Sequence, residues 1–583
     1  MSILIIFFSL IPFAFSVENL ETIEVTASKR IEDYTFSQTE TLTRDELETQ
    51  PLPLISHALE RVPGLVSSQN GGPGGRTTFF IRGTEARHIS FTLDGLKLND
   101  PSNNDRQFDA AFLSLTSVEE IRVHKGPQAV LYGSDAMGGH VEMISRKGSK
   151  KPEKKLTLNT GSFGTLGASY RHDWASGTLS LVRNRTDGIS RYNKKRFDAI
   201  ERDGSEITQL TSSSTHEITP KLKTALLASF IEGRNELDIT SDNSDERSRN
   251  HQYLLQQKTN FSLGKNSAVS LRNGINRNDR RIKNANLGNL DFTGNLYQNE
   301  LIWEVSEKEA RFLTGVSSEV ESYYLKDPKS FSLNSFFIQG LITGGDYSFQ
   351  SGVRIDHHSR YGNFLTGSTG LELKKEIGVW GLQYSRGFKA PSLYQLHDPV
   401  LGNKDLSPES NQSYEASWKK KFSKLEVASV FFHNRLSNLV TFTGSGFRNQ
   451  NRFISEGIEP SLQWSEDNFQ VKGSFTHQNI RAEEQPVLRR PYNLAQLSGT
   501  WFPTEVSELF IKGRWFDSRN DFDFAGGIAK LNSFETFDAG GSYRWDKHTV
   551  SIQVVNILNR EYEEIFGFSV MPRSLFGSYG LTF

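Results

Sequence analysis

The sequence predicts an all-β transmembrane barrel of about 22 antiparallel strands, with an N-terminal α+β plug domain inside the lumen. Three observations carry this prediction. From about residue 155 onward, apolar and polar residues alternate with period two, segment after segment. The printed sequence closes on such a segment, and residues 17 to about 148 have a different texture that mixes helix and strand signals.

Size sets the number of strands. The second region holds about 430 residues, and about 20 residues per strand with its connection give about 22 strands. A barrel that wide encloses a large lumen, and the known solution is a plug inside it. The first region is the natural candidate for that plug.

Composition narrows the class of protein. The chain has 583 residues, 36% hydrophobic and 23% charged, with a mean hydropathy of −0.49. Beyond the extreme N-terminus, no apolar stretch approaches the roughly 20 residues of a spanning helix. The absence of Cys excludes a disulfide framework, a Cys-ligated metal and a Cys nucleophile. A net charge of −1 gives no basic field for nucleic acid.

The N-terminus predicts export. Residues 3–15 are almost wholly apolar, which is too short for a spanning helix and typical of a secretion signal. Ala14 and Ser16 place small residues two apart, as at a cleavage site, although Met1-Ser2 carries no basic residue. The alternative is a buried strand or helix start. We expect a signal peptide over residues 1–16.

The first region carries local signals for helices and strands. Thr43 and Glu46 have the spacing of a capping box, and residues 51–62 have roughly helical spacing that Pro63-Gly64 ends. Three segments have strand character: 79–81, 89–93 and 118–123. These signals predict a small α+β domain.

From about residue 155 onward, the sequence predicts strands with one apolar and one polar face. Alternation is clear at 166–171, 425–428, 509–515 and 550–554. A membrane barrel needs this pattern, with lipid outside and a polar lumen inside. A water-soluble sandwich gives the same alternation, so that alternative stays open here.

The last segment favours the barrel. Its apolar face is formed by Leu575, Gly577, Tyr579, Leu581 and Phe583. Soluble proteins rarely end in such a strand because termini fray. In a closed barrel the last strand pairs with the first and leaves no edge.

Motifs along the chain resemble the TonB-dependent outer-membrane receptors over nearly its whole length. Matches follow the family's order at 59–65, 80–84, 93–95, 118–127, 131–139, 385–392, 402–409, 413–415 and 555–562. Each motif alone is weak, but the ordered series is specific. Residues 69–75 and 132–136 look most like the vitamin B-twelve (cobalamin) receptors of that family. The resemblance implies a TonB box and linker over 17–30, a plug over 31–150 and a barrel over 151–583.

The resemblance places the TonB box at residues 21–27. Ile23 and Val25 alternate with polar residues, which suits a segment that adds a strand to a partner's sheet. The alternatives are an ordinary first strand or a flexible, β-prone tail. The residues of the box are Glu21, Thr22, Ile23, Glu24, Val25, Thr26 and Ala27.

A Gly-rich run at 71–75 suggests the plug apex. It lacks the Lys-Ser/Thr and the following helix of a nucleotide site. Similarity to the cobalamin receptors implies these ligand-binding residues at the apex: Arg76, Thr77, Thr78, Leu96 and Asn99. Arg76 stands where those receptors have an apolar residue, and a plain structural turn is the alternative.

Two further groups carry charge. Arg82 and Arg122 lie on predicted plug strands, where a buried arginine needs carboxylate partners from the wall, so we expect them to dock the plug. Acidic residues in two early barrel loops are candidate calcium ligands, as the resemblance implies, with solvated charge as the alternative. They are Glu201, Asp203, Asp238, Asp242 and Asp245.

The resemblance therefore implies TonB-dependent import of a scarce, large nutrient across the bacterial outer membrane. Cobalamin is the first hypothesis and a ferric siderophore the second; a passive porin or adhesin barrel and a secreted soluble enzyme are remoter. No catalytic motif stands above chance, so we expect no enzyme and no required cofactor. The expected partners are TonB, a small-molecule ligand and the lipid bilayer, with no nucleic acid, and the expected state is a monomer.

Overall fold

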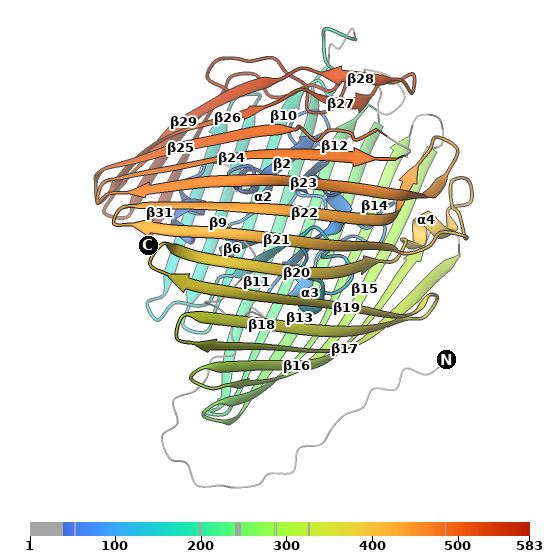
Figure 1. Cartoon of the computed structure of the whole chain (residues 1–583). Coiled ribbons are helices and arrows are strands. Elements are labelled where there is room, and N and C mark those ends of the chain that lie inside the picture. The colour runs from blue at the N-terminus through green and yellow to red at the C-terminus, as the bar shows by residue number, and fades with distance from the viewer. Residues whose placement is uncertain are drawn as a thin grey trace.

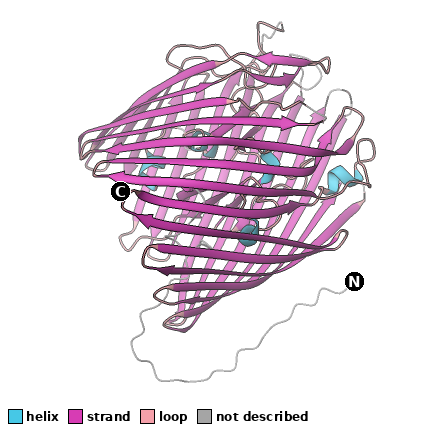
Figure 2. Cartoon of the chain, in the orientation of Figure 1, coloured by secondary structure: helices cyan, strands magenta, loops and turns pink. Residues whose placement is uncertain are grey.

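The fold is a closed β-barrel around an N-terminal domain (Figures 1 and 2). It was obtained as a computed structural model, which describes residues 39–51, 54–197, 201–238, 246–284, 286, 288–324, 327–483 and 486–583. None of the helices in this described part of the chain has the length and apolar character that crossing a membrane requires. The predicted barrel of about 22 antiparallel strands with a plug is confirmed.

The barrel strands run in chain order around the wall. They are β8 (Glu153–Gly161), β9 (Thr165–Trp174), β10 (Gly177–Ile189), β11 (Asp203–Thr219), β12 (Leu222–Leu237), β13 (Glu246–Gly264), β14 (Ser267–Asn284), β15 (Gly288–Ser306), β16 (Ala310–Tyr324), β17 (Pro328–Gly344), β18 (Tyr347–His358), β19 (Gly362–Lys375), β20 (Gly378–Lys389), β21 (Glu409–Phe422), β22 (Leu425–Phe442), β23 (Phe447–Ser465), β24 (Phe469–Ala482), β25 (Asn493–Thr504), β26 (Ser507–Phe516), β29 (Phe534–Trp545), β30 (His548–Val555) and β31 (Ser574–Thr582).

Two connections carry structure of their own. A small hairpin, β27 (Arg519–Phe522) with β28 (Ile528–Leu531), lies between β26 and β29. Helix α4 (Leu393–His397) lies between β20 and β21. The barrel closes where β31 pairs with β8, from Phe576 opposite Gly161 to Thr582 opposite Lys155. The terminal strand therefore pairs with the first barrel strand, as the sequence predicts.

Alternation along each strand sorts side chains between lipid and lumen. On β26, Leu509, Ile511 and Trp515 are exposed on the outer surface, whereas Lys512 and Arg514 face the lumen. Apolar side chains that would aggregate a soluble protein are stable here because lipid covers them. Low overall hydrophobicity is thus compatible with a membrane protein.

The two ends of the barrel differ. At one end, which we call the turn end, connections such as 175–176 and 423–424 are very short. At the other, the loop end, connections such as 390–408 and 556–573 are long. Barrels of this kind place short turns in the periplasm and long loops outside the cell.

The plug is built on a five-stranded mixed sheet. Its order is β1 (Thr39–Leu42), β6 (Val118–Lys125), β7 (Gly139–Ser145), β4 (Ile89–Leu93) and β5 (Leu96–Lys97), with β4 parallel to β7. A hairpin of β2 (Leu65–Gln69) and β3 (Thr77–Ile81) stands beside it. The predicted strands at 79–81, 89–93 and 118–123 all form.

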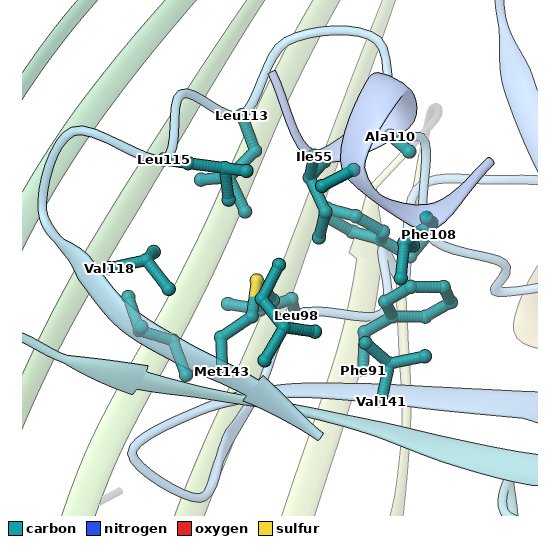
Figure 3. Packing of buried hydrophobic residues seen from close by; sticks show 14 of the residues in the cluster. Ile55, Phe91, Leu98, Phe108, Ala110, Leu113, Leu115, Val118, Val141 and Met143 are labelled. Atoms are coloured by element: carbon teal, nitrogen blue, oxygen red, sulfur yellow. The ribbon is translucent and has the colours of Figure 1, made fainter. Parts of the chain in front are cut away.

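The plug has its own apolar core. Ile55, Phe91, Leu98, Phe108 and Met143 pack together between the sheet and the short helices (Figure 3). The helices are α1 (Arg44–Glu48), α2 (Ile55–Leu59), the 3-10 helix η1 (Ala86–His88) and α3 (Ala129–Tyr132). Most of this core comes from the plug itself, so the plug is a folded unit, and wall residues of β11–β13 such as Ile207 and Ile231 complete the core on one side.

The helical segment of the plug is shorter than its spacing predicts. Thr43 begins α1, and its backbone N–H donates to Glu46 Oε2 at 3.0 Å, as in the expected capping box. The spacing over 51–62 yields only α2. Pro51 lacks a backbone N–H and disfavours helical geometry in the preceding residue, which separates the two helices.

Candidate functional site

The Gly-rich run forms the apex of the plug at the loop end of the barrel. Gly71 and Gly74 have φ angles of +72° and +77°, which L side chains rarely adopt. A Cβ on Gly71 would lie 2.8 Å from Arg191 Cα, and one on Gly74 would lie 2.2 Å from Ser205 Oγ. The run is glycine because it turns sharply while packed against the wall.

Two of the five residues predicted to bind ligand are accessible at this apex. The side chain of Arg76 is 37% exposed; it donates to Asn103 Oδ1 at 3.2 Å and lies 3.6 Å from Asp105. Thr78 is half-buried. The side chain of Thr77 is fully buried and donates to the carbonyl of Gly75 at 2.9 Å.

Leu96 and Asn99 lie inside the plug. Leu96 belongs to the apolar core. Asn99 Oδ1 accepts from the Phe91 N–H at 3.1 Å, and its Nδ2 donates to the Arg106 carbonyl at 3.0 Å. In this conformation these side chains hold the β4–β5 hairpin together, so they are not exposed to a ligand. The motif at 93–95 predicts the turn between β4 and β5. Only the pairing of β5 with β4 shows that the side chains after the turn point into the plug.

Three of the predicted acidic residues come together behind the apex. Carboxylate oxygens of Glu201, Asp203 and Asp238 lie within 4.8 Å of one another. Asp203 begins β11 and Asp238 follows β12, so neighbouring strands bring the two together. Asp242 and Asp245 lie outside the described residues.

Arg191 connects this acidic cluster to the apex. Its backbone N–H donates to Asp203 Oδ2 at 2.7 Å, and its guanidinium donates to the Asn70 carbonyl at 2.9 Å. The Arg191 side chain is also buried against Gly71. Anything that orders the acidic cluster therefore also positions the apex loop. Hard oxygen donors of this kind suit calcium.

Arg82 docks the plug onto the wall. Its guanidinium lies 2.9 Å from Glu415 on β21 and 2.8 Å from Glu459 on β23, and all three side chains are nearly inaccessible. Burial alone lowers the pKa of Arg82, but the two carboxylates raise it above its usual range. Arg122 makes an ion pair with Glu120 on its own strand, β6, which is a contact within the plug.

The sequence does not indicate the other ion pairs that dock the plug onto the wall. Arg106 contacts Glu321 at 2.9 Å and Asp135 at 3.1 Å, and Asp135 also accepts from Lys389 at 2.6 Å. Although burial raises the pKa of Asp135, these cations hold it well below its usual range. The plug residues are more than 200 residues from their wall partners, so the only local signal is the alternation that turns Glu321 and Lys389 toward the lumen.

Helix η1 adds a second buried set on the same side of the plug. Arg87 and His88 contact the two oxygens of Glu409 at the start of β21, both at 2.9 Å. Glu85, just before the helix, pairs with Arg490 at 2.8 Å. Burial alone raises the pKa of Glu85, but Arg490 and Arg87 lower it to about 2.

At the turn end, α1 is held by charge. Glu48 accepts from Lys155 at 2.6 Å, from Arg146 at 2.8 Å and from Arg171 at 3.3 Å. Burial alone raises the pKa of Glu48, but these three cations bring it well below its usual range. The first helix of the plug is thus fixed where the chain enters from the residues that precede Thr39.

A cavity of about 180 Å³ separates part of the plug from the wall. Its plug side includes Glu46, Glu60 and Arg61, and its wall side includes Lys512 and Arg514. Glu46 reaches across to Lys472 at 3.1 Å. The gap is polar and charged, so water can fill it. Beyond the cavity, Val66 and Phe80 of the plug still pack against Leu494, Phe516 and Phe534 on β25, β26 and β29.

The predicted signal peptide and the TonB box, residues 21–27, lie outside the described residues. Strand β1 begins at Thr39 on the edge of the plug sheet, beside β6. Any pull on the preceding segment would reach the plug first through β1 and α1.

Comparison with known proteins agrees with this architecture. Residues 146–557 match the family model described as TonB dependent receptor-like, beta-barrel, and residues 32–140 match the TonB-dependent Receptor Plug Domain. The vitamin B12 transporter BtuB of Vibrio cholerae serotype O1 is 23% identical over 593 residues, covering 97% of this chain and 95% of that protein. BtuB of Photobacterium profundum is 21% identical, covering 92% and 91%.

Solved structures share the fold. The siderophore receptor PirA of Acinetobacter baumannii superposes with a TM-score of 0.82 at 14% identity, covering 94% of this chain and 98% of that one. A mutant of the ferric enterobactin receptor PfeA of Pseudomonas aeruginosa gives 0.80 at 16% identity, with the same coverage. With both domain models matched in order over most of its length, the chain belongs to the TonB-dependent receptor family, and its barrel lies in the bacterial outer membrane.

Proposed function

We propose that this receptor imports cobalamin, a corrinoid, across the outer membrane by TonB-dependent active transport. The observation that carries the proposal is a plug that fills a closed barrel and is fixed to the wall by buried ion pairs. A ligand held at the apex cannot pass unless the plug moves. The similarity to two vitamin B12 transporters over more than nine-tenths of the chain supports cobalamin as the ligand.

The proposed cycle follows from this geometry. Ligand binds between the long loops and the plug apex, and binding frees or orders the box at 21–27. TonB takes the box as an added strand and, driven by the proton gradient of the inner membrane, pulls the plug to open a path. The outer membrane offers the protein no energy source, so an energised partner is needed. We propose a monomer without catalytic activity.

A ferric siderophore is the second candidate ligand. The observation that favours it is Arg76, a half-exposed cation at the apex, which suits an anionic ligand. The solved relatives that bind siderophores share the fold with this chain at low identity.

The deciding measurement is a binding titration of the purified receptor. We expect saturable binding of cyanocobalamin and no competition from ferric enterobactin. Tight ferric enterobactin binding without corrinoid binding would reverse the order of the two candidates. Arg76→Leu separates them further, because it should spare cobalamin and weaken an anionic siderophore by about tenfold.

Substitutions in the predicted TonB box, residues 21–27, test whether transport depends on TonB. Ile23→Pro removes a backbone N–H that strand addition to TonB uses, so uptake of cyanocobalamin by cells should be lost while binding to the purified receptor is unchanged. Ile23→Val, which keeps the strand, is the matched control. Uptake that survives both Ile23→Pro and deletion of residues 21–27 would exclude the mechanism.

We also propose calcium at the acidic cluster. The closeness of Glu201, Asp203 and Asp238 and their link to the apex through Arg191 support it. Asp203→Asn with Asp238→Asn should weaken terbium or calcium binding by at least about tenfold. Asp291→Asn, an exposed carboxylate on β15, is the control. Equal binding by both variants would mean that these carboxylates are not ligands.

A further inference from the structure

The outer surface of β20–β24 carries a row of arginines. Strand register places Arg386, Gln412, Arg435, Ile454 and Arg481 side by side across five strands. One step toward the loop end, Arg452 stands opposite Ser437. All four arginines are exposed. Since neighbouring strands lie about 4.8 Å apart, the guanidinium groups of alternate strands can converge on one small anion.

Only one of these arginines is held in an ion pair among the described residues, although Glu483 stands opposite Arg452 where β24 ends. Arg481 pairs with Glu456. In the described part of the chain, Arg386, Arg435 and Arg452 make no ion pair. Arginine brings a rigid, permanent charge that favours phosphate geometry. Three such groups together repel one another unless an anion joins them.

A second row of outward arginines differs, because its arginines do have ion-pair partners. On β12–β14, Arg234, Arg249 and Arg281 also lie side by side. There, Arg234 and Arg249 share Glu232 at 2.8 and 2.7 Å, and Arg281 pairs with Asp291 at 2.5 Å. Every arginine of that row is therefore paired with a carboxylate of the protein.

A hollow lies next to this arginine row, on its turn-end side. It has a volume of about 700 Å³ and is lined mainly by apolar side chains on β18–β23, among them Leu371, Leu382, Tyr384, Tyr414 and Phe431. Ala416 stands between Leu382 and Phe431 in the register. Its small side chain leaves the space that a larger residue would fill.

The row and the hollow meet at the edge of the lipid-facing band. Along β20, the outward residues Trp380, Leu382 and Tyr384 are followed by Arg386. Along β22, Phe431 and His433 are followed by Arg435. Tyrosines typically mark the interface in membrane barrels, and cations just beyond it meet lipid headgroups. The arginines therefore stand at headgroup level, on the loop-end side.

We propose that β20–β23 form a binding site for a phosphorylated lipid of the outer leaflet. The phosphate is held by Arg386, Arg435 and Arg452, and an acyl chain occupies the hollow over Ala416. A lipid fits better than a free anion because the apolar hollow adjoins the cations and faces the bilayer. A lipid bound there would bridge β20, β22 and β23 from outside, independently of what the receptor imports.

The test counts lipids on the whole receptor, purified in a neutral detergent, by native mass spectrometry. The probes are lipid A (a diphosphorylated glycolipid), phosphatidylcholine and inorganic phosphate. We expect the receptor to retain lipid A and to bind phosphatidylcholine and inorganic phosphate far more weakly. The triple variant R386Q/R435Q/R452Q should bind lipid A at least about tenfold more weakly. Ala416→Trp, which fills the hollow, should also reduce binding.

The matched control is R234Q/R249Q/R281Q, which removes as many outward arginines from the row whose arginines are paired with carboxylates. It should bind lipid A within about twofold of the parent, and the heat-modifiable gel mobility of each variant reports whether its barrel is folded. If both triple variants lose lipid A binding equally, the lipid is attracted by the overall positive charge and not by a specific site, which would overturn the proposal. Retention of lipid A by R386Q/R435Q/R452Q would overturn the proposal, as would inorganic phosphate binding as tightly as lipid A.

Discussion

At the scale of single residues, the docking of the plug rests on buried charge. Arg82 is enclosed by Glu415 and Glu459, and Arg106 by Glu321 and Asp135. A buried ion pair is not in itself a strong source of stability, because desolvation offsets much of the attraction. It does specify one seating of the plug, since a shifted plug would leave several charges buried without partners.

Arg82→Ala should therefore cost far more than a surface substitution. Removing the cation leaves two carboxylates buried side by side, and the cost of breaking such a pair is about 3–5 kcal/mol. The expected result is faster hydrogen exchange in β3 and β4 of the intact receptor. Arg183→Ala is the control, because Arg183 is largely exposed and a surface pair contributes about 0–1 kcal/mol. Equal protection in both variants would show that the pair does not hold the plug.

At the scale of elements, helix α3 is a joint between plug and wall. It packs against β17–β20, and two wall glycines make room for it. A Cβ on Gly387 would lie 3.3 Å from Ala129 Cβ, and one on Gly352 would lie 2.9 Å from Val130 Cγ1. The neighbouring contact of Asp135 with Lys389 reinforces the same joint. This side of the plug is thus anchored, whereas the side facing β24–β31 borders the cavity.

The double variant Ala129→Cys with Gly387→Cys should form a disulfide across that joint. The separation is close to the 3.5–4.5 Å between Cβ atoms that a disulfide needs, so a small shift suffices. The chain has no other Cys to compete. Oxidation should stabilise the docked plug by about 2–4 kcal/mol, measured as the urea concentration at which plug amides lose protection.

Reduction of the same sample is the internal control, and the single variant Ala129→Cys controls for the substitution itself. If the thiols fail to pair under mild oxidant, α3 does not sit against β20 as described. If the thiols pair but the urea concentration at which plug amides lose protection does not change, the contact between α3 and β20 is not what limits release of the plug.

At the scale of the whole molecule, the two ends of the barrel have separate tasks. The loop end holds the plug apex and the acidic cluster, joined through Arg191. The turn end holds α1, which Glu48 fixes and which follows directly on β1. A ligand arriving from outside and a partner pulling from the periplasm therefore act on opposite faces of one plug, and the plug itself has to carry the signal between them.

Much of this architecture could be predicted because it depends on local or additive properties of the chain. Alternation along β9 or β26 shows which residues share a face, whatever strand lies beside them. Total length divided by the length of a strand and its connection gives the number of strands. The arginine at 82 is recognisable because a cation on a plug strand in a polar lumen needs an anion.

Tertiary structure alone decided which residues meet. Sequence spacing says nothing of the contact of Arg82 with Glu459, of Arg106 with Glu321, or of the burial of Leu96 and Asn99. The row of Arg386, Arg435 and Arg452 appears only once the register of β20–β23 is known. The physical reason is that alternation fixes the face of a side chain, whereas its neighbours depend on the stagger that closes the barrel and on how the plug sits within it.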